Sequence, residues 1–172
     1  MANMIQYAKE QVSRVIAQAY EKAAAAGALP GGVAVKGTVE IPKDPKNGDY
    51  AASFAMAGAK AMKMAPRAIA QALVDHMDLG DTPFASVEIA GPGFLNFRLG
   101  HRWYGQVLSA IESEGALYGQ SQEGQGKRVM VEFVSANPTG PMHMGNARGG
   151  VLGDCLASVL DAAGYDVWRE FY

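Results

Sequence analysis

The sequence has 172 residues, of which 49% are hydrophobic, and a formal net charge of −2, so it lacks the global basic field that draws proteins to nucleic acid. Its length suffices for one ordinary domain, or for one small domain and part of a second. A single cysteine excludes a disulfide framework, and the lack of a signal peptide or of any apolar run near ~20 residues predicts a soluble, cytoplasmic protein with no membrane segment.

The first half of the chain predicts helices interleaved with strands. Residues 4 to 26 repeat apolar side chains at three- and four-residue spacing, which predicts an amphipathic helix. The next apolar residues share one parity and predict a half-buried strand: Val33, Val35, Val39 and Ile41. Residues 50 to 62 are rich in Ala and Met and are expected to form a helix that starts at Asp49 or Ser53. Pro66 suits the first turn of a further helix.

A second strand region begins at Val87, and residues 94 to 99 alternate strictly. One face suits a hydrophobic core: Leu95, Phe97 and Leu99. The other face carries an aromatic ring, an amide and a guanidinium: Phe94, Asn96 and Arg98. This combination suits recognition of single-stranded RNA, where bases stack on rings and amides read their edges. A solvated sheet face with one stray Phe is the simpler alternative, and both interpretations remain open.

Residues 101 to 117 predict another helix, with an inward side formed by Trp103 or Tyr104 together with Val107, Leu108 and Ile111. Residues 118 to 127 are polar and rich in Gly, Gln and Ser, which predicts a linker. Residues 1 to 117 are therefore expected to form an α+β domain, in which helices pack on a small antiparallel sheet.

Residues 129 to 172 predict a strand, a loop, a helix and a second, parallel strand, which is a βαβ unit. Pro138, Gly140 and Pro141 exclude a helix in the loop, whereas a helix can begin at His143. Gly164 is a natural helix terminator. The buried stripe of the helix is expected to be Leu152, Cys155, Leu156, Val159 and Leu160.

Two common phosphate-binding patterns fail in this loop, because neither GxxxxGK[ST] nor GxGxxG fits the glycine positions. What remains is His143-Met144-Gly145-Asn146 at a helix start. The imidazole can donate to a phosphate oxygen, the helix dipole attracts anions, and Gly145 leaves room for a purine or a ribose. A helix merely capped by a Pro-Gly loop is the simpler alternative.

The segment SANPTGPMHMGNARGGVLGDCLA closely resembles the signature region of arginyl-tRNA synthetases, class I enzymes whose motif reads His-Ile-Gly-His. Three upstream blocks resemble the additional N-terminal domain of that family: residues 48 to 51, 65 to 70 and 87 to 94. The resemblance covers essentially the whole chain.

The resemblance implies an arginine–tRNA ligase, which activates L-arginine with ATP to arginyl-adenylate and transfers it to tRNA(Arg) in translation. It implies a tRNA-recognition domain over residues 1–117, a linker over 118–127, and the start of a Rossmann-like catalytic domain over 128–172. ATP, with Mg²⁺, would be a substrate rather than a tightly bound cofactor. We also expect no metal site, no membrane partner and a monomeric full-length enzyme.

Carried over by position, His143 and Asn146 would be catalytic and, with Gly145, would bind ATP. Ser135 and Asn137 would bind arginine. Phe94 and Asn96 would contact the tRNA D-loop. The signature region as a whole comprises Ala136, Asn137, Pro138, Thr139, Gly140, Pro141, Met142, His143, Met144, Gly145 and Asn146.

Two departures from the family pattern shape the expectation. Asn146 stands where the motif has its last His, and an amide donates a hydrogen bond but carries no charge. The second family motif, Lys-Met-Ser-Lys, is missing, and residues 63 to 66 resemble it only in the wrong domain. We therefore expect a piece of a longer enzyme that is inactive alone. A free-standing RNA-binding module with a degenerate nucleotide unit is the alternative, whereas the glycine spacing argues against a dinucleotide oxidoreductase.

Overall fold

The computed structural model describes residues 4–34 and 36–172. They form two compact units, one extending to Ser113 and one from Glu114 to Tyr172. Val35, which the sequence places in a strand, lies outside the described residues. The domain limits given by the sequence, with a linker at residues 118–127, stay a prediction.

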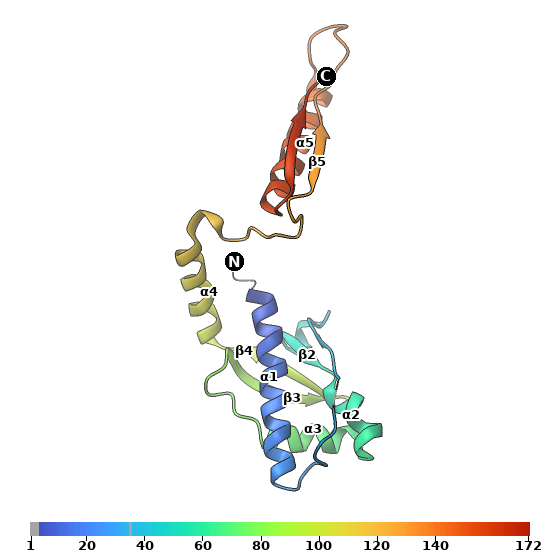
Figure 1. Ribbon diagram of the computed structural model, residues 1–172, viewed down its shortest axis with the longest axis vertical. Coiled ribbons are helices and arrows are strands. Elements are labelled where there is room, and N and C mark those ends of the chain that lie inside the picture. Colours follow the sequence, from blue (N-terminus) through green and yellow to red (C-terminus); the bar gives the residue numbers. More distant parts are fainter. Residues whose placement is uncertain (1–3, 35) are drawn as a thin grey trace. The chain divides into compact units, whose positions relative to one another are not determined.

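The N-terminal unit is an α+β fold built on a four-stranded sheet (Figure 1). The strand order is β1-β2-β4-β3, and all neighbouring strands are antiparallel, which confirms the small antiparallel sheet. In chain order the elements are α1 (Met4–Ala25), β1 (Val39–Glu40), a 3-10 turn (Pro45–Asn47), β2 (Tyr50–Ala52), α2 (Phe54–Met62), α3 (Pro66–Asp75), β3 (Phe84–Ala90), β4 (Phe94–Leu99), α4 (His101–Glu114) and a 3-10 turn (Gly115–Leu117).

One hydrophobic core joins the helices to the sheet. The buried side of α1 repeats at helical spacing, as the sequence predicts: Ala8, Val12, Val15, Ile16, Ala19 and Ala23. Leu95 and Phe97 of β4 are completely buried, which confirms the predicted core face of that strand. The Phe84 ring packs 5.1 Å from the Phe97 ring and 6.2 Å from the Tyr50 ring, in geometries typical of aromatic pairs. Burial raises the pKa of Tyr50, and the charge of Asp49 adds to this effect.

Two predictions for the segment before α2 are wrong. Residues 50–52 form β2 rather than helix, which rules out Asp49 as the helix start, whereas Ser53, the other predicted start, is the N-cap of α2. The cause is tertiary, because β2 pairs with both β1 and β4 and is fully buried, which outweighs the helix preference of alanine. Of the described residues in the strand predicted over Val33 to Ile41, only Val39 and Glu40 form a strand, and Ile41 is exposed.

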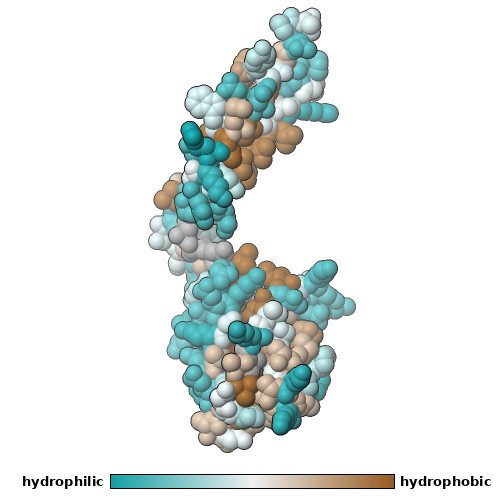
Figure 2. All heavy atoms as spheres, turned by 45° about the vertical axis from the view of Figure 1, so that its right-hand side comes forward, coloured by the Kyte–Doolittle hydropathy of each residue, from teal (hydrophilic) through white to brown (hydrophobic). Residues whose placement is uncertain are grey.

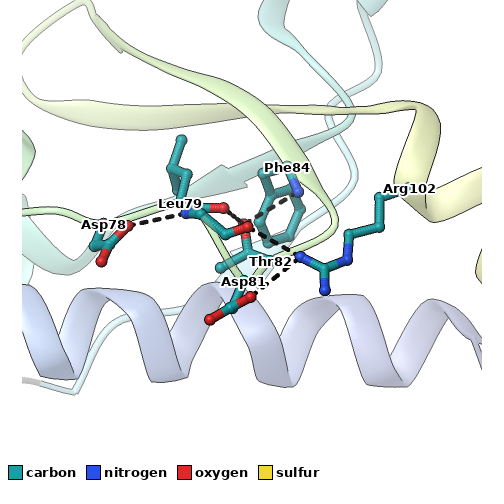
Figure 3. A network of polar contacts seen from close by, with 7 residues as sticks. Asp78, Leu79, Asp81, Thr82, Phe84 and Arg102 are labelled. Carbon is teal, nitrogen blue, oxygen red and sulfur yellow. Dashed lines mark hydrogen bonds and ion pairs between the residues drawn. The ribbon is translucent and has the colours of Figure 1, made fainter.

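The start of α4 is fixed by polar contacts with the loop between α3 and β3 (Figure 3). Arg102 Nη1 donates to the Gly80 carbonyl at 2.9 Å and lies 3.4 Å from Asp81 Oδ1. Thr82 Oγ1 donates to the Leu79 carbonyl at 2.8 Å within the same loop. The loop thus carries its own hydrogen bonds and holds the helix that follows β4.

The predicted inward side of α4 is only partly correct. Trp103 is buried, and Val107 packs against the core. Leu108 and Ile111 are exposed, contrary to the prediction, and Tyr104, the alternative to Trp103, is exposed as well. The helix touches the N-terminal core near its start only, so the rest of its apolar stripe has no cover within the unit.

The C-terminal unit is the predicted βαβ arrangement. Strand β5 (Arg128–Glu132) and strand β6 (Asp166–Glu170) pair in parallel, and helix α5 (Met144–Ala162) connects them. Gly164 ends the helix region with φ +85°, as expected of a terminating glycine. Backbone N–H groups of the preceding segment bind this turn, since Ser121 and Gly124 donate to the Ala162 and Ala163 carbonyls at 2.8 and 2.9 Å.

Helix α5 meets the strands through small residues. Gly153 and Ala157 are its buried residues, and a Cβ placed at Gly153 would lie 2.2 Å from the Phe133 Cβ. The predicted buried stripe is therefore wrong in most members, because these are exposed: Leu152, Cys155, Leu156 and Val159. Two strands offer the helix one narrow contact, and its larger apolar residues point away from it. Figure 2 shows apolar residues, in brown, at the surface of this unit.

None of the helices in the described ranges is long and apolar enough to cross a membrane.

The close contact at Gly153 makes a stability prediction. Gly153→Ala should destabilise the C-terminal unit by about 1–3 kcal/mol, because Phe133 and the helix must move apart. Hydrogen exchange in peptides from β5 and β6 measures this, since two units need not unfold together. Gly149→Ala is the matched control on the same helix, because a Cβ there meets nothing within 4 Å and alanine favours the helix. Equal exchange in the two variants would contradict the tight helix–strand contact.

Candidate functional site

A solvent-open hollow lies between the end of β5 and the start of α5. It is lined by Val134, Ser135, Ala136, Asn137, Pro138, Thr139, Gly140, Pro141, Met142, His143, Asn146 and Phe171. Four of the five residues predicted to bind ATP or arginine line this hollow together: Ser135, Asn137, His143 and Asn146. Gly145 is the exception, and it lies in the first turn of α5.

The chain leaves β5 through an unusual backbone conformation. Val134 has φ +65°, a left-handed conformation that is rare for a β-branched residue. A Cβ at Gly150 would lie 2.9 Å from the Val134 Cγ2, so the absence of a side chain there lets α5 approach the turn. Backbone strain of this kind persists where surrounding contacts enforce it, and such strain clusters at functional sites.

His143 caps α5 and is tied to the first turn in both directions. Its Nδ1 accepts a hydrogen bond from the Gly145 N–H at 3.0 Å. The Asn146 Oδ1 accepts from the His143 N–H at 3.0 Å, which completes a capping box. The side chain of His143 is exposed, and its Nε2 has no hydrogen-bond partner in the described part of the chain.

These bonds change which donors face the hollow. The N–H groups of Gly145 and Asn146 are already engaged, the first by the His143 Nδ1 and the second by the His143 carbonyl at 3.0 Å. At the start of α5, two side chains that line the hollow can still donate, through His143 Nε2 and through the amide of Asn146. The helix start can therefore offer an anion neutral side-chain N–H donors in place of these two backbone amides.

The two residues predicted to bind arginine lie on the opposite part of the loop. Ser135 Oγ accepts from the Tyr172 N–H at 3.1 Å and can still donate its own hydrogen. Asn137 is exposed, and its carbonyl accepts from the Thr139 N–H at 2.8 Å. Its side-chain amide has no partner among residues 4–34 and 36–172. Phe171 also lines the hollow, and nothing in the sequence pattern indicated this, because its position depends on the pairing of β6 with β5.

The three upstream blocks of the resemblance meet around β4 in the N-terminal unit. The Asp49 carboxylate accepts from the Leu99 N–H at 2.7 Å, and a Cβ at Gly48 would lie 2.7 Å from the Phe97 carbonyl oxygen. At the other end of the strand, Arg67 donates to the Gly91 carbonyl at 3.0 Å. From the sequence, the only structural role predicted for Asp49 was a possible helix start. In the structure, Asp49 instead anchors the end of β4.

The predicted RNA face of β4 is more enclosed than its alternation suggests. Phe94 and Arg98 are half-buried, and Asn96 is only 7% exposed. Arg98 reaches sideways, where its Nη2 donates to the Lys46 carbonyl at 2.9 Å. This face of the strand is therefore not the freely solvated face with one stray Phe that the simpler alternative describes.

The described ranges contain no group of three or more His, Cys, Asp or Glu side chains that could hold a metal ion.

Comparison with known proteins assigns each unit. Residues 8–99 match the family described as the arginyl tRNA synthetase N terminal domain, and residues 106–172 match the class I (R) tRNA synthetase catalytic domain. The hollow beside His143 thus lies in part of a class I tRNA synthetase catalytic domain. The chain belongs to the arginyl-tRNA synthetase family.

Relatives of known name agree over the whole chain. It is 49% identical over 172 residues to the arginine–tRNA ligase of Acetivibrio thermocellus, covering 100% of this chain and 30% of that protein. The arginine–tRNA ligase of Caldanaerobacter subterraneus is also 49% identical, with 100% and 31% covered. The structure of the arginyl-tRNA synthetase of Plasmodium falciparum shares the fold, with TM-score 0.54 and 15% identity over 95% of this chain and 30% of that one. The chain therefore spans about 30% of the length of these relatives.

Proposed function

We propose that this chain supplies the N-terminal part of an arginine–tRNA ligase. The complete enzyme would use ATP and arginine to form arginyl-adenylate and pyrophosphate, and would then pass the arginyl group to tRNA(Arg) in cytoplasmic translation. Within this chain, the C-terminal unit would hold the nucleotide and part of the arginine site, and the N-terminal unit would contact the tRNA. A monomeric enzyme that takes ATP together with Mg²⁺ completes the proposal.

One observation carries the proposal: a single open hollow is lined by Ser135 and Asn137 from the first part of the loop and by His143 and Asn146 from the start of α5. Adenylate formation requires that an arginine carboxylate and the α-phosphate of ATP meet within bonding reach. A site that holds the amino acid beside the nucleotide satisfies this requirement. The polar groups of this loop are also largely free to bind a ligand, because few of them are engaged within the chain.

The chemistry assigned to this hollow is stabilisation of charge. The arginine carboxylate oxygen attacks the α-phosphorus in line, the bond to the β-phosphate bridging oxygen breaks, and pyrophosphate leaves. In the second step a hydroxyl of the tRNA 3′ end attacks the arginyl carbonyl, and AMP leaves. In the first step negative charge grows on the phosphate oxygens, and donors already fixed in place lower that barrier. His143 Nε2–H and the Asn146 amide are the donors that this chain contributes.

The N-terminal unit contributes a rigid strand to tRNA contact. Anchors at both ends of β4 hold its outer face, where the half-buried Phe94 ring offers a surface on which a base can stack. Because Asn96 is almost buried, it can contact only a ligand group that lies directly against the strand.

A free-standing RNA-binding module is the competing function. The match of residues 106–172 to a catalytic domain favours the enzyme. The sequence downstream of Tyr172 separates the two, since a reading frame that reaches a Lys-Met-Ser-Lys-like loop supports the enzyme and an immediate stop codon supports the module.

The 172-residue chain alone should not catalyse arginine-dependent exchange of pyrophosphate into ATP, because the hollow is open and the second signature motif is missing. The protein expressed from the complete reading frame should catalyse it. Measurable exchange by the 172-residue chain would show that these residues already form a whole site.

His143→Ala in the complete protein should lower the rate of arginine-dependent exchange about 100-fold or more, the usual effect of removing one charge-stabilising donor. The loss of the cap should cost the helix only about 1 kcal/mol. His101→Ala, at an exposed position in the N-terminal unit, is the control. A large fall in melting temperature with normal exchange would assign His143 to stability instead.

Phe94→Ala in the complete protein should reduce kcat/KM for tRNA about tenfold, which is within the range of one lost base stack, and should leave ATP binding unchanged. Asn96→Ala should act in the same direction. Glu88→Ala provides the control, since Glu88 lies opposite Asn96 in the sheet and is exposed. Charging efficiencies equal to that of the control would remove this face from the tRNA site.

A further inference from the structure

Asn146, the last residue of the signature motif, is hydrogen-bonded to the backbone of the same motif. The Asn146 Oδ1 accepts a hydrogen bond from the His143 N–H at 3.0 Å, three residues back. This bond holds the oxygen at the His143 backbone and leaves both hydrogens of the amide nitrogen free to donate in the hollow that Asn146 lines. The third helical position usually carries Glu or Gln when its side chain reaches back to the capping residue, and here Asn146 makes that contact.

The second bond decides the protonation pattern of the imidazole. The His143 Nδ1 accepts from the Gly145 N–H at 3.0 Å, and a ring nitrogen that accepts cannot carry a proton. In the neutral ring the proton must then reside on Nε2. The ring thereby offers the hollow a hydrogen-bond donor without needing a positive charge.

Gly145 provides the surface on which this ring rests. A Cβ at position 145 would lie 2.9 Å from the His143 Cε1 and 3.0 Å from its Nδ1. Any side chain would therefore push the ring off the N–H group that it accepts from. The three residues form one unit, in which Asn146 fixes the backbone of His143, and Gly145 both supports the ring and donates to it.

We propose that Asn146 is a positioning residue, which holds the His143 backbone so that its imidazole docks on Gly145 as the Nε2–H tautomer and presents a neutral donor to the hollow. The catalytic meaning of this arrangement rests on the function proposed above, but the tautomer itself does not. Asn in place of the motif's last His then contributes through His143, in addition to any contact of its own amide with a ligand.

The chain contains its own reference for the tautomer. His76 Nδ1 lies 2.8 Å from the Ala72 carbonyl oxygen, which can only accept. His76 must therefore carry its proton on Nδ1, the opposite pattern to that of His143. One spectrum of the 172-residue chain thus reports both states side by side.

The test is long-range ¹H–¹⁵N correlation of the imidazoles, recorded at about pH 8.5, where ordinary imidazoles are neutral. We expect an unprotonated Nδ1 at His143 and a protonated Nδ1 at His76. Asn146→Ala should shift His143 towards mixed tautomers and make the Gly145 N–H exchange with solvent about fivefold faster, the loss of one ordinary hydrogen bond. Asn146→Gln, which keeps a capping amide oxygen, should restore both signals.

A second pair of variants distinguishes a specific change at His143 from general unfolding. Gly145→Ala keeps the backbone N–H but crowds the ring, so it should also erase the His143 signature. Gly149→Ala, where a side chain has open space on the same helix, should leave it intact. A protonated Nδ1 at His143 in the unaltered chain, or a signature that survives Asn146→Ala, would overturn the proposal.

Kinetics of the complete protein connect the arrangement to catalysis. Asn146→Ala should lower kcat for arginine-dependent exchange about tenfold or more without changing KM for arginine, and Asn146→Gln should recover most of it. Unchanged kcat in Asn146→Ala would overturn the catalytic part. Absence of exchange in the unaltered complete protein, with tRNA(Arg) present, would instead refute the proposed function, while the spectra would still decide the tautomer.

Discussion

The start of α5 is closed by two hydrogen bonds that run in opposite directions, and the site in the C-terminal unit depends on them. The imidazole of His143 accepts from one helical N–H, and Asn146 accepts from the His143 N–H. Together they fix where the helix begins. The prolines before His143 cannot continue the helix, so residues 135 to 142 must form an open loop. The hollow results from this combination of a fixed helix start and a loop that cannot fold onto it.

Glycines, which have no side chain, allow the same helix to approach the strand closely. A Cβ at Gly150 would crowd Val134, and one at Gly153 would overlap Phe133. The N-terminal unit uses the same device at Gly48, which lies against the Phe97 carbonyl of β4. In both units, close contacts at glycines hold the element that carries the proposed binding residues. Rigid positioning of this kind reduces the ordering needed when a ligand binds.

The sequence predicts most of the elements, because their patterns are local. The amphipathic repeat of α1, the strand pattern of residues 94 to 99 and the Pro-Gly loop before His143 each specify one structure, and these elements are confirmed. Where packing decides, the sequence fails. Residues 50–52 contain alanines that favour helix, yet two neighbouring strands draw them into the sheet. The apolar stripes of α4 and α5 predict burial, but these units provide no surface to cover them. The sequence pattern also did not predict that Asn146 completes the capping box with His143, because this contact depends on the backbone direction at His143.

The central claim is that the hollow beside His143 holds the phosphates of ATP. The most direct measurement is a crystal structure of the complete protein with a non-hydrolysable ATP analogue and arginine. We expect a phosphate oxygen at hydrogen-bond distance, about 3 Å, from the His143 Nε2, with the Nδ1 still accepting from the Gly145 N–H. A nucleotide bound away from this hollow, or an imidazole turned so that Nδ1 faces the phosphates, would contradict the account.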